Sequence, residues 1–214
     1  MNQTEMAAET VRLLRQQYPG ADCTLSFEQP WHLLVAAILA AQCTDARVNQ
    51  VTPGLFRRFP TLFDLAAADI LEIEDLIKSC GLYHNKARAI LGASQCLIEK
   101  HQGVMPAALE ELVALPGVGR KIANLILGDC FGIPAIVVDT HCARISCLIG
   151  LTSQTSPQAI ERDLAHVVPE KDWIAYGHLM VSHGRALCVA RRPECPACPL
   201  NSFCRHAAGS GQLS

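Results

Sequence analysis

The chain of 214 residues is predicted to be all-α, and three observations lead to that fold class. Apolar residues recur at three-and-four spacing along most of the chain, and helix-start residues precede many of these stretches. The one strand-like run, residues 136–138, is too short and too isolated to form a sheet. We therefore expect about eleven helices of roughly 6 to 18 residues, packed as a bundle or helical barrel.

The most apolar of the expected helices covers residues 30–41. Pro30 can occupy its first turn, because the backbone N–H that proline lacks has no intrahelical partner there. The apolar run from Leu33 to Ala41 makes this segment the expected centre of the fold, although it is far shorter than the about 20 residues of a membrane span. Other helices are expected after Thr61 and Ser156, along 87–98, and beyond the boundary at Gly103 and Pro106.

The composition favours a protein that is neither exported nor inserted in a membrane. The first residues, Met-Asn-Gln-Thr-Glu, contain no basic segment followed by an apolar one, so we expect no secretory signal and a cytoplasmic location. The formal net charge of −2 argues weakly against a nucleic-acid partner, but the distribution of charge matters more than its sum. Residues 176–206 hold four arginines and a single glutamate, which indicates a basic contact surface.

Eleven cysteines are many for a chain in which disulfides are not expected. Seven are scattered singly and are interpreted as small core residues. The other four, separated by six, two and five residues, indicate a metal centre: Cys188, Cys195, Cys198 and Cys204. An iron–sulfur cluster is favoured over zinc, because it needs four thiolates and accepts uneven spacing, whereas zinc ribbons usually combine two Cys-x-x-Cys pairs.

The segment between the first two of these cysteines carries Arg191 and Arg192. A metal that fixed both ends of this dibasic loop would turn it into a rigid contact for phosphates. Two solvated arginines without a partner are the alternative.

The second motif is Leu-Pro-Gly-Val-Gly-Arg-Lys at residues 115–121, between helices expected at 107–114 and 119–131. Gly117 and Gly119 permit a tight turn with exposed backbone N–H groups. The N-terminus of the following helix adds a partial positive charge, so the turn can hold a phosphate without reading bases. This helix-hairpin-helix pattern predicts binding to a DNA backbone, but it does not by itself indicate catalysis.

Lys121 has two interpretations. It can be one more phosphate contact, or its amine can act as a nucleophile. The second role needs a neutral amine, and an ordinary lysine of pKa about 10.4 is neutral only about once in 2,500 molecules at pH 7. We expect partial burial in the first helical turn beside Arg120 to lower the pKa, so that the amine can attack a sugar C1′ atom and form a Schiff base.

Asp139 stands eighteen residues after Lys121, in Val-Asp-Thr-His at 138–141, and opens a helix expected to run to about residue 149. It is predicted to be the N-cap of that helix. A capping carboxylate stays ionised and fixed, so the same residue can also stabilise a sugar cation and move protons.

Taken together, the motif at 115–121, the motif at 138–141 and the cysteine spacing resemble the endonuclease III family from about residue 10 to residue 206. The resemblance implies two all-α lobes flanking a DNA groove: a six-helix barrel at 22–133 that carries the hairpin, and a 4Fe-4S cluster domain built from 1–21 and 134–211. It implies a monomeric DNA glycosylase and AP lyase, which excises oxidised or ring-fragmented pyrimidines from duplex DNA or cleaves at an AP site.

The resemblance also assigns roles to single residues. Lys121 matches the family's nucleophile and Asp139 its essential carboxylate. Residues 41–45 match a segment whose glutamine enters the duplex, which gives that role to Gln42 and brings Asp45 to the DNA. Residues 81–87 match a loop whose leucine acts as a wedge, here Leu82. The further DNA contacts expected are Gly117, Gly119, His141, Arg144, Arg191 and Arg192.

Some residues depart from the family pattern: Ala40 replaces serine, Cys43 replaces alanine and Ile122 replaces threonine. These changes leave the chemistry intact but bear on substrate preference. Three alternatives stay open: an adenine-mismatch glycosylase, a mismatch-specific thymine glycosylase, both of which usually lack the hairpin lysine, and a non-enzymatic DNA-binding module with structural zinc.

Overall fold

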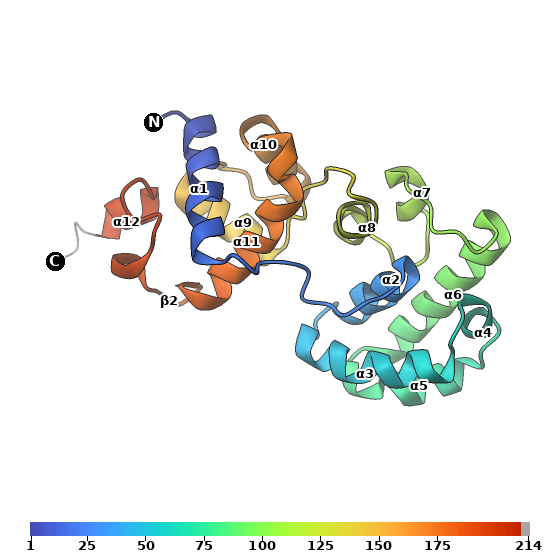
Figure 1. Ribbon diagram of the computed structural model, residues 1–214. Coiled ribbons are helices and arrows are strands. Elements are labelled where there is room, and N and C mark those ends of the chain that lie inside the picture. The colour runs from blue at the N-terminus through green and yellow to red at the C-terminus, as the bar shows by residue number, and fades with distance from the viewer. Residues whose placement is uncertain (211–214) are drawn as a thin grey trace. The chain divides into compact units, whose positions relative to one another are not determined.

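The computed structural model describes residues 1–210, and Figure 1 shows that the chain is helical almost throughout. The chain forms two compact units. The hairpin unit is Cys23–Phe131, and the cysteine unit is Met1–Asp22 together with the chain from Gly132 onward. Residue 211, the expected end of the cluster domain, lies outside the described residues.

The hairpin unit is built around α2 (Pro30–Leu39). Every residue from Trp31 to Leu39 is buried, because the helix packs against α3, α6 and α8 on its different sides. The expected central helix is therefore confirmed, but its expected end at residue 41 is wrong. The helix stops at Leu39, since Gln42 takes a left-handed conformation with φ of 54° and the chain turns away. The other elements are α3 (Asp45–Arg58), α4 (Leu62–Ala66), α5 (Ile70–Ile77), the 3-10 turn η1 (Lys78–Cys80), α6 (Tyr83–His101), α7 (Leu109–Val113) and α8 (Arg120–Phe131).

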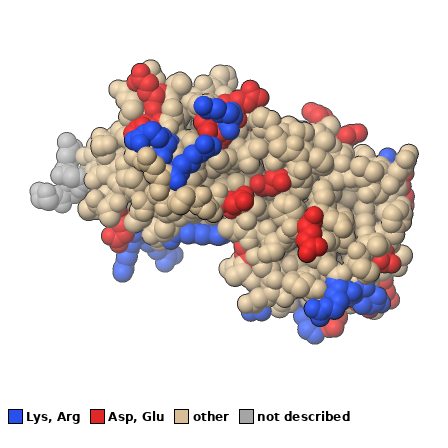
Figure 2. Space-filling model, viewed as in Figure 1, with Lys and Arg blue, Asp and Glu red and all other residues tan. Residues whose placement is uncertain are grey.

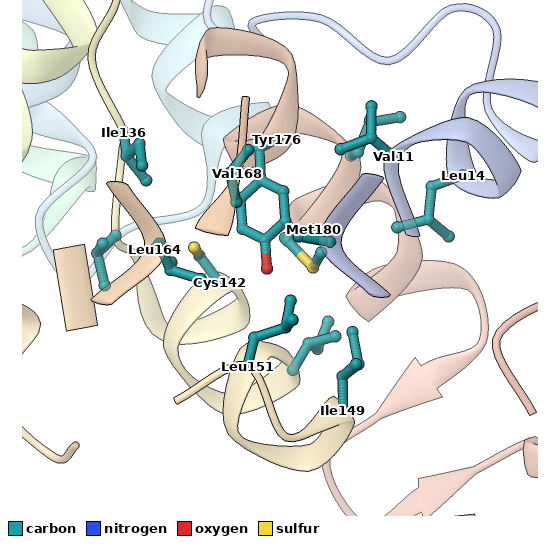
Figure 3. Close-up of a cluster of buried hydrophobic side chains, with 14 of the residues drawn as sticks. Val11, Leu14, Ile136, Cys142, Ile149, Leu151, Leu164, Val168, Tyr176 and Met180 are labelled. Atoms are coloured by element: carbon teal, nitrogen blue, oxygen red, sulfur yellow. The ribbon is translucent and has the colours of Figure 1, made fainter. Parts of the chain in front are cut away.

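The cysteine unit has its own core, centred on Tyr176. Figure 3 shows the Tyr176 ring among Val168, Met180 and Cys142, and its hydroxyl lies 2.8 Å from the Ser146 hydroxyl. This bond satisfies a polar group that is otherwise fully buried. The elements are α1 (Gln3–Gln17), α9 (Thr140–Ile149), α10 (Pro157–Val167), the 3-10 turn η2 (Glu170–Asp172), α11 (Trp173–Ala186), β1 (Cys188–Val189), β2 (Arg192–Pro193), the 3-10 turn η3 (Cys195–Ala197) and α12 (Arg205–Ser210).

The all-α prediction is confirmed, with twelve α-helices among the described residues. Residues 136–138 form no strand, as expected. A two-stranded antiparallel ribbon between β1 and β2 was not predicted, because two residues on each side of a short turn leave no periodic pattern to detect. In the described part of the chain, no helix combines the length and the apolar character needed to cross a membrane.

Candidate functional site

Two buried apolar side chains anchor the hairpin between α7 and α8. Leu115 and Val118 are buried, and the Val118 N–H donates to the Leu115 carbonyl at 3.1 Å. Gly117 has φ of +76°, and a Cβ atom there would lie 2.6 Å from the Ala89 Cβ. Only glycine fits that position, both because of its backbone conformation and because of the close packing.

Gly119 differs from Gly117, although both are exposed. A Cβ atom at Gly119 would meet nothing within 4 Å, and no left-handed conformation requires glycine there. The protein's own packing therefore does not explain this glycine. The space in front of it, next to the N-terminus of α8, is where a helix offers backbone N–H groups without intrahelical partners to an anion.

Lys121 lies in the first turn of α8, as predicted. The expectation that it is partly buried is wrong, because its side chain is exposed. The inward face of α8 is formed instead by other residues of the helix, including Ala123, Ile126 and Leu127. The free protein therefore does not bury the Lys121 amine.

Asp139 is the N-cap of α9, as predicted. Its Oδ1 atom accepts a hydrogen bond of 2.7 Å from the Cys142 backbone N–H, and the residue is half-buried. The cap fixes the carboxylate and leaves its second oxygen available for other partners. Burial raises the pKa of the Cys142 thiol, and the neighbouring Asp139 charge adds to that effect. Asp139 belongs to the cysteine unit and Lys121 to the hairpin unit.

The four cysteines of the C-terminal segment meet at one cavity. They line it together with apolar side chains of α9 and of the segment itself, including Ile145, Ile149, Leu187 and Leu200. The cysteines reach the cavity from different local elements: Cys188 from β1, Cys195 from η3, Cys198 from the end of η3, and Cys204 from the residue before α12.

The donor set fits a metal centre. Burial raises the pKa of the Cys195 and Cys198 thiols, and the Cys204 and Cys188 charges raise both further. Four thiolates that line one apolar cavity repel one another, so a bound cation is what makes the deprotonated form favourable. Four thiolates are the donor set of iron–sulfur clusters and also of some zinc sites.

Two residues of α9 that were expected to contact DNA are engaged inside the cysteine unit. The Arg144 guanidinium donates to the Cys188 carbonyl at 2.6 Å and to the Cys188 Sγ atom at 3.5 Å. His141 packs on α11, where a Cβ atom at Gly184 would lie 2.3 Å from its Nδ1 atom. Both side chains are half-buried.

Arg191 and Arg192 are exposed at the end of the ribbon. Cys188 pairs with Pro193 and Val189 with Arg192, so Arg191 lies in the connecting turn. On the face that Figure 2 shows, basic and acidic side chains are interspersed, and neither sign of charge forms one continuous surface there.

Gln42 and Leu82 lie on two turns of the hairpin unit and share an unusual backbone. Both have positive φ, 54° and 48°, and both side chains are exposed, Leu82 at 57%. An exposed leucine on a strained turn is an outlier that points to a contact outside the protein. Asp45, in the first turn of α3, accepts a 2.6 Å hydrogen bond from the Thr24 hydroxyl.

Sequence reasoning missed one residue beside these turns. Lys86 is 5% exposed, and its Nζ atom donates to the Leu39 and Cys80 carbonyls at 2.8 and 2.6 Å. A lysine in the first turns of an amphipathic helix usually lies at the surface, so no local signal indicated its burial.

Comparison with known proteins places the chain in a family. Residues 35–170 match the model of the HhH-GPD superfamily base excision DNA repair proteins. An endonuclease III of Synechocystis sp. is 48% identical over 207 residues, which is 96% of this chain and 94% of that protein.

Solved structures give the same result. A trapped endonuclease III–DNA covalent intermediate matches with a TM-score of 0.93 and 40% identity, over 99% of this chain and all of that one. A thermostable thymine-DNA glycosylase matches with a TM-score of 0.82 and 18% identity, over 97% of each chain, and so shares the fold alone. The prediction of a base-excision DNA repair enzyme is thereby confirmed. The chain belongs to the endonuclease III family, within the HhH-GPD superfamily.

Proposed function

We propose that this protein is a monomeric DNA glycosylase and AP lyase, which removes oxidised or ring-fragmented pyrimidines from duplex DNA and then cleaves the strand. The observation that carries the proposal is the placement of Lys121: an exposed amine in the first turn of a helix that begins at the glycine hairpin. The covalent complex of a 40%-identical endonuclease III with DNA supports a reaction through an enzyme nucleophile.

In this proposal the hairpin positions the DNA backbone, and the Lys121 amine is the nucleophile. The Gly119 N–H and the N-terminus of α8 hold a phosphate, which brings the sugar of the damaged nucleotide to the Lys121 amine. Because Lys121 is exposed in the free protein, bound DNA is what would exclude water from its amine.

The reaction then proceeds in two stages. The Lys121 lone pair forms a bond to C1′ while the glycosidic C–N bond breaks, and the base leaves with the bonding electron pair and is protonated. The C1′–O4′ bond then breaks, a proton passes from the Lys121 nitrogen to O4′, and the ring opens to the protonated Schiff base. Loss of a C2′ proton to a base leaves its electron pair as the C2′–C3′ double bond, and the 3′ phosphate departs with the electrons of the C3′–O bond in β-elimination.

Asp139 is the proposed carboxylate of this reaction. Its N-cap bond to Cys142 holds the carboxylate in place, so its charge can stabilise positive charge on the sugar and its oxygen can accept a proton. Because the cap needs only an oxygen acceptor, Asp139→Asn keeps the cap and removes the charge.

The remaining contacts would bind the duplex. Gln42 and Leu82 would fill the gap left by the extruded nucleotide, at an unstacking cost of about a few kcal/mol. Arg191 and Arg192 would bind phosphates from the ribbon turn. Asp45, His141 and Arg144 would contribute less, since each already has a partner within the protein.

We further propose that Cys188, Cys195, Cys198 and Cys204 hold a 4Fe-4S cluster. When bound, it supplies iron–thiolate bonds that fix both ends of the arginine-bearing ribbon. Zinc in the same four-thiolate site is the competing assignment. Iron and acid-labile sulfide in the purified protein, with a brown colour, support the cluster, whereas a colourless zinc-loaded protein contradicts it.

The test of the reaction is borohydride reduction in the presence of duplex DNA that contains thymine glycol. We expect a covalent protein–DNA adduct with the parent protein, no adduct with Lys121→Ala, and a strong loss with Asp139→Asn. An adduct that survives in Lys121→Ala contradicts the lysine assignment. Activity on an adenine mismatch in place of thymine glycol would favour the mismatch glycosylases, and binding without any cleavage would favour the non-enzymatic module.

A further inference from the structure

Lys86 is the one buried lysine among the described residues, and nothing in the proposed reaction uses it. It is the fourth residue of α6, and the carbonyls that its Nζ atom binds belong to two other elements. Leu39 is the last residue of α2, and Cys80 is the last residue of η1. A helix leaves its last carbonyls without intrahelical partners and carries partial negative charge there, so one ammonium ion satisfies both ends.

These two carbonyls mark the start of the two turns that carry the exposed Gln42 and Leu82. Gln42 follows Leu39 by three residues, and Leu82 follows Cys80 by two. The Lys86 backbone N–H also donates to the Leu82 carbonyl at 3.2 Å. One residue therefore contacts both turns.

Both turns have a strained backbone conformation, which contacts with other parts of the protein must stabilise. Leucine and glutamine at positive φ each cost about 1 kcal/mol or more, and such conformations persist only where the surrounding structure fixes them. The Leu82 N-cap position of α6 has no side-chain capping bond. Burial raises the pKa of the Cys80 thiol to about 11, and Cys43, the residue after Gln42, is near enough to raise it further.

We propose that Lys86 is a positioning residue for damage recognition: its buried ammonium ion fastens the two turns together, so that Gln42 and Leu82 enter the duplex as one unit. The inference rests on the proposed function, because it takes these two residues as those that fill the gap in the base stack. Arginine is not expected to be equivalent here, since its planar fork differs from the compact lysine ammonium ion that binds both carbonyls.

The test compares Lys86→Met, which keeps the length of the side chain and removes its charge, with Lys100→Met at the exposed end of the same helix. Single-turnover rates are measured on two substrates, base excision on the first and strand cleavage on the second. One is thymine glycol in an intact duplex, where the stack must be opened and refilled. The other is an AP site inside an unpaired bubble, where no base stack has to be opened or refilled.

We expect Lys86→Met to slow excision from the intact duplex about tenfold or more and to change cleavage in the bubble about twofold or less, with Lys100→Met like the parent on both. On a Leu82→Ala background, Lys86→Met should have little further effect, because the two residues act through the same contact. Equal losses on both substrates, no loss on either, or full additivity with Leu82→Ala would each overturn the inference.

Borohydride trapping with the parent protein is performed first, so that failure of the proposed function is seen before any variant is compared. A parent that traps DNA while Lys86→Met loses both activities equally would leave the function standing and reduce Lys86 to a folding role. If Lys86→Met does not fold, Lys86→Gln, which keeps a donor but cannot reach both carbonyls, takes its place under the same criteria.

Discussion

At the scale of single residues, the two glycines of the hairpin serve different purposes, and this gives a first prediction. Gly117→Ala should lower the free energy of unfolding, by about 1–3 kcal/mol, because the new methyl group meets Ala89 and the residue must keep positive φ. Gly119→Ala should leave the stability nearly unchanged and weaken DNA binding, because its methyl group meets only the space proposed for a phosphate.

Urea unfolding and titration of a labelled duplex measure the two effects separately. Unchanged DNA affinity in Gly119→Ala would contradict the phosphate site at the turn. A large loss of stability in the same variant would mean that the turn needs glycine for folding rather than for binding.

His32 gives a prediction about pH. Its ring is buried, stacks on Phe56 at 4.0 Å between centroids, and accepts a hydrogen bond at Nδ1 from the Glu28 backbone N–H. Burial lowers the pKa of His32 in the folded protein, against a smaller opposing effect of the Glu28 charge. Below about pH 6.5 the unfolded chain therefore takes up a proton that the folded protein resists.

The stability provided by neutral His32 is consequently present above pH 6.5 and lost as the pH falls below that value. Urea unfolding at pH 7.5 and pH 5.5 should show a larger loss of stability in the parent than in His32→Leu. Equal losses in the two proteins would show that other groups cause the decline.

At the scale of elements, glycines in two helices should respond to alanine in opposite directions. Gly184 lies on α11 against α9, and a Cβ atom there would clash with His141 and approach Ile145 within 3.1 Å. Gly184→Ala should therefore destabilise the protein by about 1–3 kcal/mol. Gly54 is exposed within α3 with nothing within 4 Å, so Gly54→Ala should stabilise it by up to about 1 kcal/mol.

Thermal unfolding of the two variants beside the parent checks both signs. A neutral Gly184→Ala would mean that His141 moves aside without cost, and so that the contact between α9 and α11 is looser than its distances indicate. A destabilising Gly54→Ala would contradict the exposed position of that residue.

The elements also show where sequence patterns were sufficient. Asp139 caps α9, Thr61 and Asp64 form a capping box at α4, and Ser156 with Pro157 begins α10, because capping depends on residues three or four positions apart. The end of α2 was misplaced by two residues, since Ala40 and Ala41 continue the apolar pattern while Gln42 reverses the chain.

At the scale of the whole molecule, a net charge of −2 must be reconciled with a polyanionic substrate. If about four phosphates are contacted, log affinity should fall with log salt concentration at a slope near −3.6. Replacing Arg191 and Arg192 by alanine should reduce the magnitude of that slope by about 1.8, because two phosphate contacts are lost.

Fluorescence anisotropy over a series of salt concentrations measures the slope. Arg12→Ala is the matched control, since the Arg12 guanidinium is engaged with Glu9 in α1, and its slope should equal that of the parent. An unchanged slope in the double variant would remove the ribbon from the proposed DNA contacts.

The sequence by itself determined the features that local spacing encodes. Helix caps, the apolar run of α2, the turn at 115–121 and the grouping of four cysteines all depend on residues close together in the chain. They could therefore be predicted, and the resemblance to a family that rests on them was confirmed.

Only the tertiary structure decided which side chains are buried against distant segments. Lys86 bonds to a carbonyl 47 residues away, and Arg144 to Cys188, 44 residues away. Lys121 is exposed where the sequence favoured partial burial, and Gln42 and Leu82 lie on left-handed turns. The physical reason is that desolvation and backbone strain are set by whatever packs around a residue, and that information is spread over the whole chain.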